Sequence, residues 1–216
     1  MLSAGCTIRV DGNAVAAADL GRYPAPVAVS ALEALLLSAA ALDAALRVEG
    51  MTVEDSSHSG ISGQTASDDC AAIWNVAWRP MYAGSGWIAI RNQFVQTHDR
   101  LMRVWQAVAA FPLPVDATAF HRKQAAAWRT CEHRRLEMRF LDEPASRDGF
   151  FNIGAAQDHQ GVLFQSSTQA NDTTWACEHA LSAANNVIVD VQVCGERLTG
   201  QAESLTRAIA AKVPVS

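Results

Sequence analysis

Apolar residues recur at helical spacing in the first part of the folded region. Between residues 30 and 47 the repeated positions are Leu32, Leu35, Leu36, Ala39, Leu42 and Leu46. This spacing of three to four residues is typical of the buried face of a helix. Ser30 and Glu33 have the spacing of a capping box, in which both side chains satisfy backbone donors at the helix start. The pattern therefore predicts a helix over residues 30–47, ended by Gly50.

Alternation of apolar and polar residues, which is typical of strands, follows this helix. A short strand is expected at residues 51–55, then a polar loop at 56–70, then an antiparallel pair of strands at 86–96 and 102–111. Five further strands, separated by polar turns, are expected at residues 136–141, 150–156, 161–168, 175–182 and 186–193.

Two more helices complete the expected fold. One runs from Asp116, as its N-cap, to Trp128, and its inner residues are Phe120, Ala127, Trp128 and Cys131. The last helix covers residues 200–212, with Leu205, Ile209 and Val213 on one face. Strands that follow strands, with helices at both ends and one between, predict an α+β fold: an antiparallel sheet packed with about three α-helices.

Composition limits the classes of protein to which the chain can belong. It has 216 residues, 50% hydrophobic and 18% charged, which is enough for one good core and one domain. The formal net charge of −5 excludes a basic field of the kind that holds nucleic acid, so no nucleic-acid partner is expected. The most apolar run, residues 34–42, is nine residues long and is too short to span a membrane.

The number and spacing of the five cysteines indicate the cellular compartment in which the chain resides. The sequence contains neither CxxC nor HxxxH, so a metal site is poorly supported, and no cofactor is expected. Four widely separated cysteines and one near the N-terminus favour two disulfides and an odd cysteine, which implies an oxidising, extracytoplasmic setting. Free buried thiols, which are common in cytosolic cores, are the alternative.

The odd cysteine, Cys6, ends the sequence LSAGC, which partly matches the cleavage site of bacterial lipoproteins. The five residues before it are too few for the basic and apolar parts of a secretory signal. Either the sequence starts inside its signal peptide or the match is chance. Because disulfides independently require export, we favour a truncated lipoprotein signal with Cys6 as the lipid anchor. Residues 1–28, which include Pro24 and Pro26, are then signal and flexible tether, and 29–216 form the domain.

Several segments together resemble the PknH-like extracellular domain family, which comprises sensor domains of mycobacterial serine/threonine kinases and cell-envelope lipoproteins. The similar segments, in the family's order, are residues 35–53, 68–74, 81–93, 104–112, 127–131, 175–181, 185–195 and 208–213. The resemblance implies an extracytoplasmic α+β domain with Cys70 bonded to Cys131, Cys177 bonded to Cys194, and a cleft for an unidentified ligand. GCTIRVDGNAVAA, after Leu2, also resembles the start of mature lipoproteins in this group.

Catalytic residues are not evident. The six histidines are scattered, and Ser85, between Gly84 and Gly86, lacks the GxSxG spacing of a hydrolase nucleophile and is better explained by a turn. The kinase-linked members of the family carry a kinase that these 216 residues do not contain, so phosphorylation is not expected of this chain. We expect the chain not to be an enzyme.

Polar residues on the expected strands are the candidates for ligand contact. We expect contact from Trp87, Arg91, Gln93, Gln106, His179 and Asp190. Asp190 is the most informative of these, because a carboxylate within the apolar run VIVDVQV needs a partner or water, unless it lies at an exposed strand edge. The expected function is a lipid-anchored, extracytoplasmic sensor domain for a small molecule, a lipid or a cell-wall component. An envelope hydrolase and a purely structural envelope protein are the alternatives.

Overall fold

The structure is a computed structural model that describes residues 25–60, 64–65, 69–140 and 149–214. Cys6 and most of the expected tether lie outside these residues. The helices are α1 (Ala39–Leu46), α2 (Arg79–Tyr82), α3 (Pro114–Arg129) and α4 (Gln201–Ala210), with 3-10 turns η1 (Val29–Ala31), η2 (Glu33–Leu35) and η3 (Asp69–Ile73). The strands are β1 (Met51–Ser57), β2 (Gln64–Thr65), β3 (Ala89–Thr97), β4 (Met102–Ala110), β5 (Arg135–Phe140), β6 (Gly149–Ile153), β7 (Gln157–His159), β8 (Val162–Gln169), β9 (Asp172–Ala184) and β10 (Val187–Glu196).

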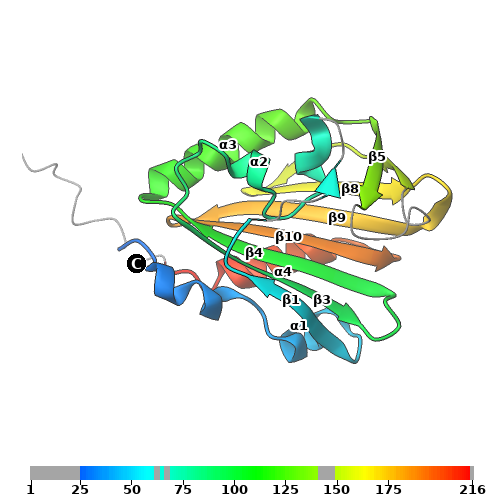
Figure 1. Ribbon diagram of the computed structural model, residues 1–216, viewed down its shortest axis with the longest axis horizontal. Coiled ribbons are helices and arrows are strands. Elements are labelled where there is room, and N and C mark those ends of the chain that lie inside the picture. The colour runs from blue at the N-terminus through cyan, green and yellow to red at the C-terminus, as the bar shows by residue number, and fades with distance from the viewer. Residues whose placement is uncertain (1–24, 61–63, 66–68, 141–148, 215–216) are drawn as a thin grey trace, which may run out of the picture.

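The strands form one antiparallel, ten-stranded sheet in the order β1-β3-β4-β10-β9-β8-β6-β5-β2, with β7 paired to β8 (Figure 1). The long hairpin of β9 and β10 lies at its centre. The predicted α+β class and antiparallel sheet are confirmed, although the described residues contain four α-helices instead of about three.

Helices cover both faces of this sheet. Along β10 the odd-numbered valines, Val187 to Val193, pack with α4 and with the N-terminal segment. The even-numbered positions face the other way, where Ile188 packs with residues of α3. Strand β10 is therefore buried on both faces, which explains why its sequence is an almost continuous apolar run. Each buried valine contributes about 1.5–3 kcal/mol of hydrophobic stabilisation.

The predicted helix over residues 30–47 is wrong in its first half. Residues 29–35 form two 3-10 turns, and α1 begins only at Ala39, with Ser38 as its N-cap. Ser30 makes no capping contact. The break has a tertiary cause: the Leu37 amide donates to Gln106 Oε1 at 2.9 Å and the Leu37 carbonyl accepts from Gln106 Nε2 at 2.7 Å. A residue whose two backbone groups are bound by a neighbouring strand cannot join a helical ladder.

Other boundaries shift by smaller amounts. Helix α3 begins at Pro114 after Leu113, and Asp116 sits inside its first turn, where its Oδ2 accepts the Leu113 N–H at 3.1 Å. Ala127, expected on the inner side, is exposed. The sequence pattern did not predict η3, α2 or β7, which are short elements whose residues carry no periodic signal.

The two disulfides connect as the family resemblance implies. Cys70 in η3 is bonded to Cys131 just beyond α3, with their Cα atoms 5.6 Å apart. Cys177 and Cys194 are direct partners across β9 and β10, with their Cα atoms 4.0 Å apart. The hairpin between them turns at Asn185 and Asn186.

Candidate functional site

A buried polar cluster lies at the centre of the sheet, on the α3 side. Asp190 on β10 is fully buried, and its Oδ1 is 2.6 Å from His179 Nε2 on the neighbouring strand β9. Its Oδ2 accepts two further hydrogen bonds, from the Ala77 N–H at 2.9 Å and the Tyr82 hydroxyl at 3.0 Å. Asp190 therefore has partners and does not lie at a strand edge.

Hydrogen-bond balance fixes the tautomer of the histidine. His179 Nδ1 lies 2.7 Å from the carbonyl oxygen of Ile73, which can only accept, so this nitrogen carries a hydrogen. His179 Nε2 and Asp190 Oδ1 share one further hydrogen, and the other carboxyl oxygen of Asp190 accepts two hydrogen bonds. The ring of Trp128 covers the histidine at 4.6 Å between centroids.

The hydrogen bonds of this cluster hold residues 71–82 against the sheet. Three side chains of β9 and β10 hold its backbone: His179 at Ile73, Asp190 at Ala77, and Gln192, whose Nε2 donates to the Trp74 carbonyl at 2.5 Å. All three side chains are buried. The arrangement is a set of satisfied internal contacts, so His179 and Asp190 are occupied in holding the fold.

Tyr82 makes the cluster sensitive to alkaline pH. Burial raises the pKa of its hydroxyl well above the ordinary value of 10.0, and the charge and hydrogen bond of Asp190 raise it further. Above about pH 10 the unfolded chain loses the tyrosine proton while the folded chain keeps it, so the free energy of unfolding falls as the pH rises. We expect urea unfolding between about pH 9 and pH 11 to show a steeper loss for the wild type than for Tyr82→Phe. Parallel curves for the two proteins would contradict this prediction.

The other expected contact residues do not join this cluster. Gln106 is buried on the opposite face, where it binds Leu37 and donates to Gln93 Oε1 at 3.2 Å. Arg91 lies on that face too, with its Nε 3.6 Å from a carboxylate oxygen of Glu33. Trp87 instead packs with the core on the α3 side. The six residues are thus divided between two faces of the sheet and do not line one cleft.

The hydroxyl of Ser85 is hydrogen-bonded to the backbone. Its hydroxyl donates to the Tyr82 carbonyl at 2.7 Å, which accounts for the turn between the two glycines. Within the described ranges, no hydrogen bond joins a serine or threonine hydroxyl to a histidine ring. Nor does that part of the chain gather three or more His, Cys, Asp or Glu residues in a group that could hold a metal ion.

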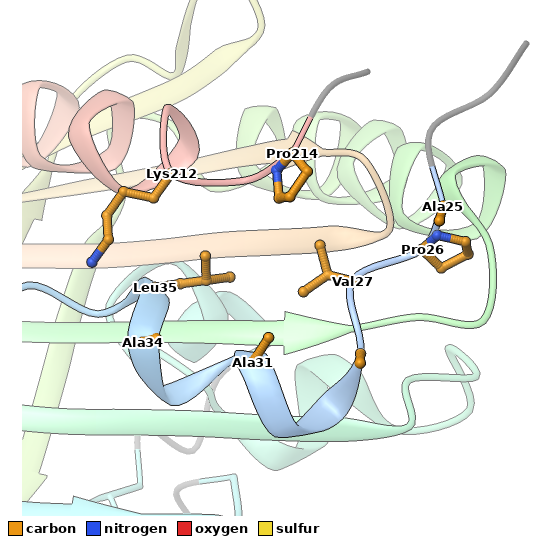
Figure 2. Close-up of a pocket in the computed structure, with 9 residues that line it drawn as sticks. Ala25, Pro26, Val27, Ala31, Ala34, Leu35, Lys212 and Pro214 are labelled. Carbon is orange, nitrogen blue, oxygen red and sulfur yellow. The ribbon is translucent and has the colours of Figure 1, made fainter.

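A hollow of about 450 Å³ opens between the N-terminal segment and the end of the chain (Figure 2). We call it the terminal hollow. Figure 2 shows the side chains of Val27 and Leu35 opposite the residues that follow α4. The lining residues are Ala25, Pro26, Val27, Ala28, Ala31, Ala34, Leu35, Lys212 and Pro214. Among the described residues of this lining, Lys212 is the only charged one, and its Nζ donates to the Leu36 carbonyl at 2.9 Å.

Two asparagines of the β9–β10 turn hold the walls of the terminal hollow in place. Asn185 Nδ2 donates to the carbonyls of Ala25 and Pro214, at 2.9 and 3.1 Å. Asn186 Oδ1 accepts the Val27 N–H at 2.7 Å, and its amide nitrogen donates to the Val27 carbonyl at 3.3 Å. Contacts with the turn therefore include Ala25 and Val27, which precede the expected domain start at residue 29, and the turn positions both ends of the described chain.

The terminal hollow was missed from the sequence because its lining is small and apolar, like any core or tether. The one available signal was the pair Asn185-Asn186, whose four amide donors and acceptors exceed what a two-residue turn needs.

Similarity to known proteins agrees with this architecture. The family model described as the PknH-like extracellular domain matches residues 27–212. The chain belongs to this family. The matched range of the PknH-like domain includes Val27, which is bonded to Asn186, and covers both disulfides.

Relatives of this PknH-like domain include the serine/threonine-protein kinases PknH of Mycobacterium tuberculosis (strain ATCC 25618 / H37Rv), 32% identical, and of Mycobacterium bovis (strain ATCC BAA-935 / AF2122/97), 31% identical. Each match covers 88% of this chain but only 30% and 32% of the respective kinase, so the chain spans about a third of their length. The crystal structure of the extracellular domain of PknH from M. tuberculosis superposes with a TM-score of 0.81 and 29% identity, over 88% of this chain and 97% of that one.

Membership of an extracellular domain family places this PknH-like domain outside the cytoplasm. Among the residues that the structure describes, no single helix is long and apolar enough to cross a membrane. The segments Val29–Leu35 and Ala39–Leu46 reach that length only together, and they are bent by 43° where they meet.

Proposed function

We propose that this PknH-like domain is a sensor module, tethered to the membrane by a lipid on Cys6, that binds a small amphipathic ligand in the terminal hollow and performs no chemistry. The ligand would be a lipid-like molecule with an apolar body and an anionic group. The observation that carries the proposal is the composition of the hollow, which is apolar apart from one lysine at its rim.

The size and shape of the terminal hollow support this function. Its volume of about 450 Å³ falls in the range of roughly 300–1,000 Å³ that small-molecule sites occupy. An apolar body that enters it gains about 25 cal/mol for each Å² of surface removed from water. Its walls are held by side-chain amides from a hairpin turn, so the site is pre-formed.

Lys212 supplies the polar end of the proposed site. One of its three N–H donors is bound to Leu36, which leaves two donors for a ligand group. A carboxylate or phosphate at this position would form charge-assisted hydrogen bonds, which are about twice as strong as neutral ones. A neutral ligand would gain only the apolar contacts.

The fluorescence of a dansyl-labelled fatty acid titrated with the full chain tests this proposal. We expect saturable binding, a loss of about tenfold or more in affinity for Ala34→Phe, which fills the hollow, and no loss for Ala40→Phe, an exposed position on α1 outside it. Lys212→Gln should weaken the fatty acid but not the corresponding alcohol. Absence of saturable binding, or equal effects of the two phenylalanine variants, would refute the proposal. Native mass spectrometry of protein purified from its own envelope would then identify the natural ligand.

A further inference from the structure

The outer face of α3 is basic, although the chain as a whole is acidic. Residues 114–129, which form α3, contain three of the chain's 17 Lys and Arg residues and one of its 22 Asp and Glu residues, which gives a formal charge of +2. The whole chain carries −5, so the remaining residues carry −7. Charge of one sign gathered on one element creates a local potential opposite to that of the rest of the molecule.

The edge of the sheet away from α3 is acidic. Residues 25–60, which form the N-terminal segment, α1 and β1, contain five acidic residues and one basic residue, a formal charge of −4. Figure 1 shows α3 packed over the central strands, while β1 is an edge strand of the sheet and α1 lies beside it, away from α3. The charges are therefore separated along the sheet, from α3 to the β1 edge, which gives the domain an electrostatic orientation.

Three basic side chains of α3 are available to a partner. Arg122, Lys123 and Arg129 are exposed, and we call them the basic face. Across the described part of the chain, no ion pair or hydrogen bond engages these three side chains. Arg122 and Arg129 are seven residues apart, which places them on the same side of the helix.

Exposed apolar residues lie at the start of the same helix. Val115 is 60% exposed and Leu113 is 52% exposed. Val115 is seven residues before Arg122, so it continues the stripe of the basic face. Ile88, 53% exposed, lies at the same end of the sheet, since its N–H donates to the Ala110 carbonyl at 2.8 Å, just before the start of α3.

We propose that the outer face of α3 docks the domain on the surface of an anionic lipid bilayer. Basic side chains attract the phosphate groups of such a surface, and exposed apolar side chains beside them enter the interface between headgroups and acyl chains. The charge separation turns α3 toward the bilayer and α1 with β1 away from it. Asn185 holds the Ala25 carbonyl and Asn186 holds the carbonyl of Phe111, just before α3, so a tether that continues from Ala25 is compatible with this orientation.

A bilayer explains the combination of features better than a soluble polyanion does. A polyanion would use the three charges of the basic face but leave Leu113, Val115 and Ile88 in water. A bilayer surface engages both groups. The proposal is independent of the terminal hollow, since α3 contributes none of its lining residues.

Vesicle co-sedimentation tests the docking surface. The full chain would carry Cys6→Ser, so that no lipid anchor contributes, and would be mixed with vesicles of phosphatidylcholine alone or with phosphatidylglycerol added. We expect binding only to the anionic vesicles, with a decline as NaCl rises from about 0.05 M to about 0.5 M. Each basic residue near such a surface strengthens binding by about fivefold, so Arg122→Gln/Lys123→Gln/Arg129→Gln should weaken it by about a hundredfold.

A control variant distinguishes binding by the basic face from an effect of net charge on binding. Ala40→Glu/Ala44→Glu/Ala208→Glu changes the net charge by the same −3 at exposed positions of α1 and α4, and we expect it to change binding by less than about threefold. Val115→Ser should weaken binding without altering its salt dependence. The proposal is overturned if the wild type does not bind anionic vesicles, if both triple variants lose binding equally, or if heparin retains the protein while vesicles do not.

Discussion

Replacement of Asp190 with alanine should lower the free energy of unfolding by about 3–5 kcal/mol. The substitution leaves three buried groups without their partner: the His179 Nε2 atom, the Ala77 N–H and the Tyr82 hydroxyl. Each buried polar group without a partner costs about 1–3 kcal/mol. Urea unfolding followed by tryptophan fluorescence measures the change, because Trp128 lies against the histidine ring.

Two further variants distinguish the loss of the whole cluster from the loss of one contact. Tyr82→Phe removes one hydrogen bond of the same cluster and should cost only about 1 kcal/mol. His179→Leu/Asp190→Val removes both partners of the central hydrogen bond together, and we expect it to be less destabilising than the sum of the two single changes. A loss below about 1 kcal/mol for Asp190→Ala would show that the buried cluster does not hold residues 71–82 on the sheet.

Removal of the Cys70–Cys131 disulfide should lower the free energy of unfolding by about 4 kcal/mol. The bond closes 61 residues, and in the chain-entropy model the stabilisation grows with the length of chain that is closed. It also joins η3 to the end of α3, so its loss frees the segment that the buried cluster holds. The measurement is urea unfolding of Cys70→Ala/Cys131→Ala under oxidising conditions.

The second disulfide provides the comparison. Cys177–Cys194 closes only 17 residues, and Cys177→Ala/Cys194→Ala should cost about 3 kcal/mol. Its two strands are also joined along their whole length by the β9–β10 ladder. If its removal proved more costly than removal of Cys70–Cys131, chain entropy would not be the main source of disulfide stability in this domain.

The sheet was predictable because its strands carry strong local signals. Residues 186–193, for example, are apolar and β-branched at most positions, and they form most of β10. The segment 30–47 misled the prediction because its helical periodicity is real, while the contact that interrupts it comes from Gln106, 69 residues away. No local pattern contains such a contact, since it exists only after β4 has formed.

The candidate site was less predictable for a related reason. Asp190 was recognised as a residue that needs a partner, but the partners come from β9 and from residues 77 and 82, which only the fold brings together. The terminal hollow is formed by segments from opposite ends of the chain, so its existence depends on how the termini pack. The pairing of cysteines followed from family resemblance, because several pairings were compatible with the spacing alone.

The contacts of Asn185 give the domain a mechanical property. One side-chain amide holds the backbone at both Ala25 and Pro214, on a turn that joins the two central strands. Tension on either flanking segment would act first on the hydrogen bonds of this turn, where Asn186 also holds Val27. It would loosen the walls of the terminal hollow before it disturbed the rest of the sheet, so occupancy of the hollow and tension on the tether would be coupled through these two asparagines.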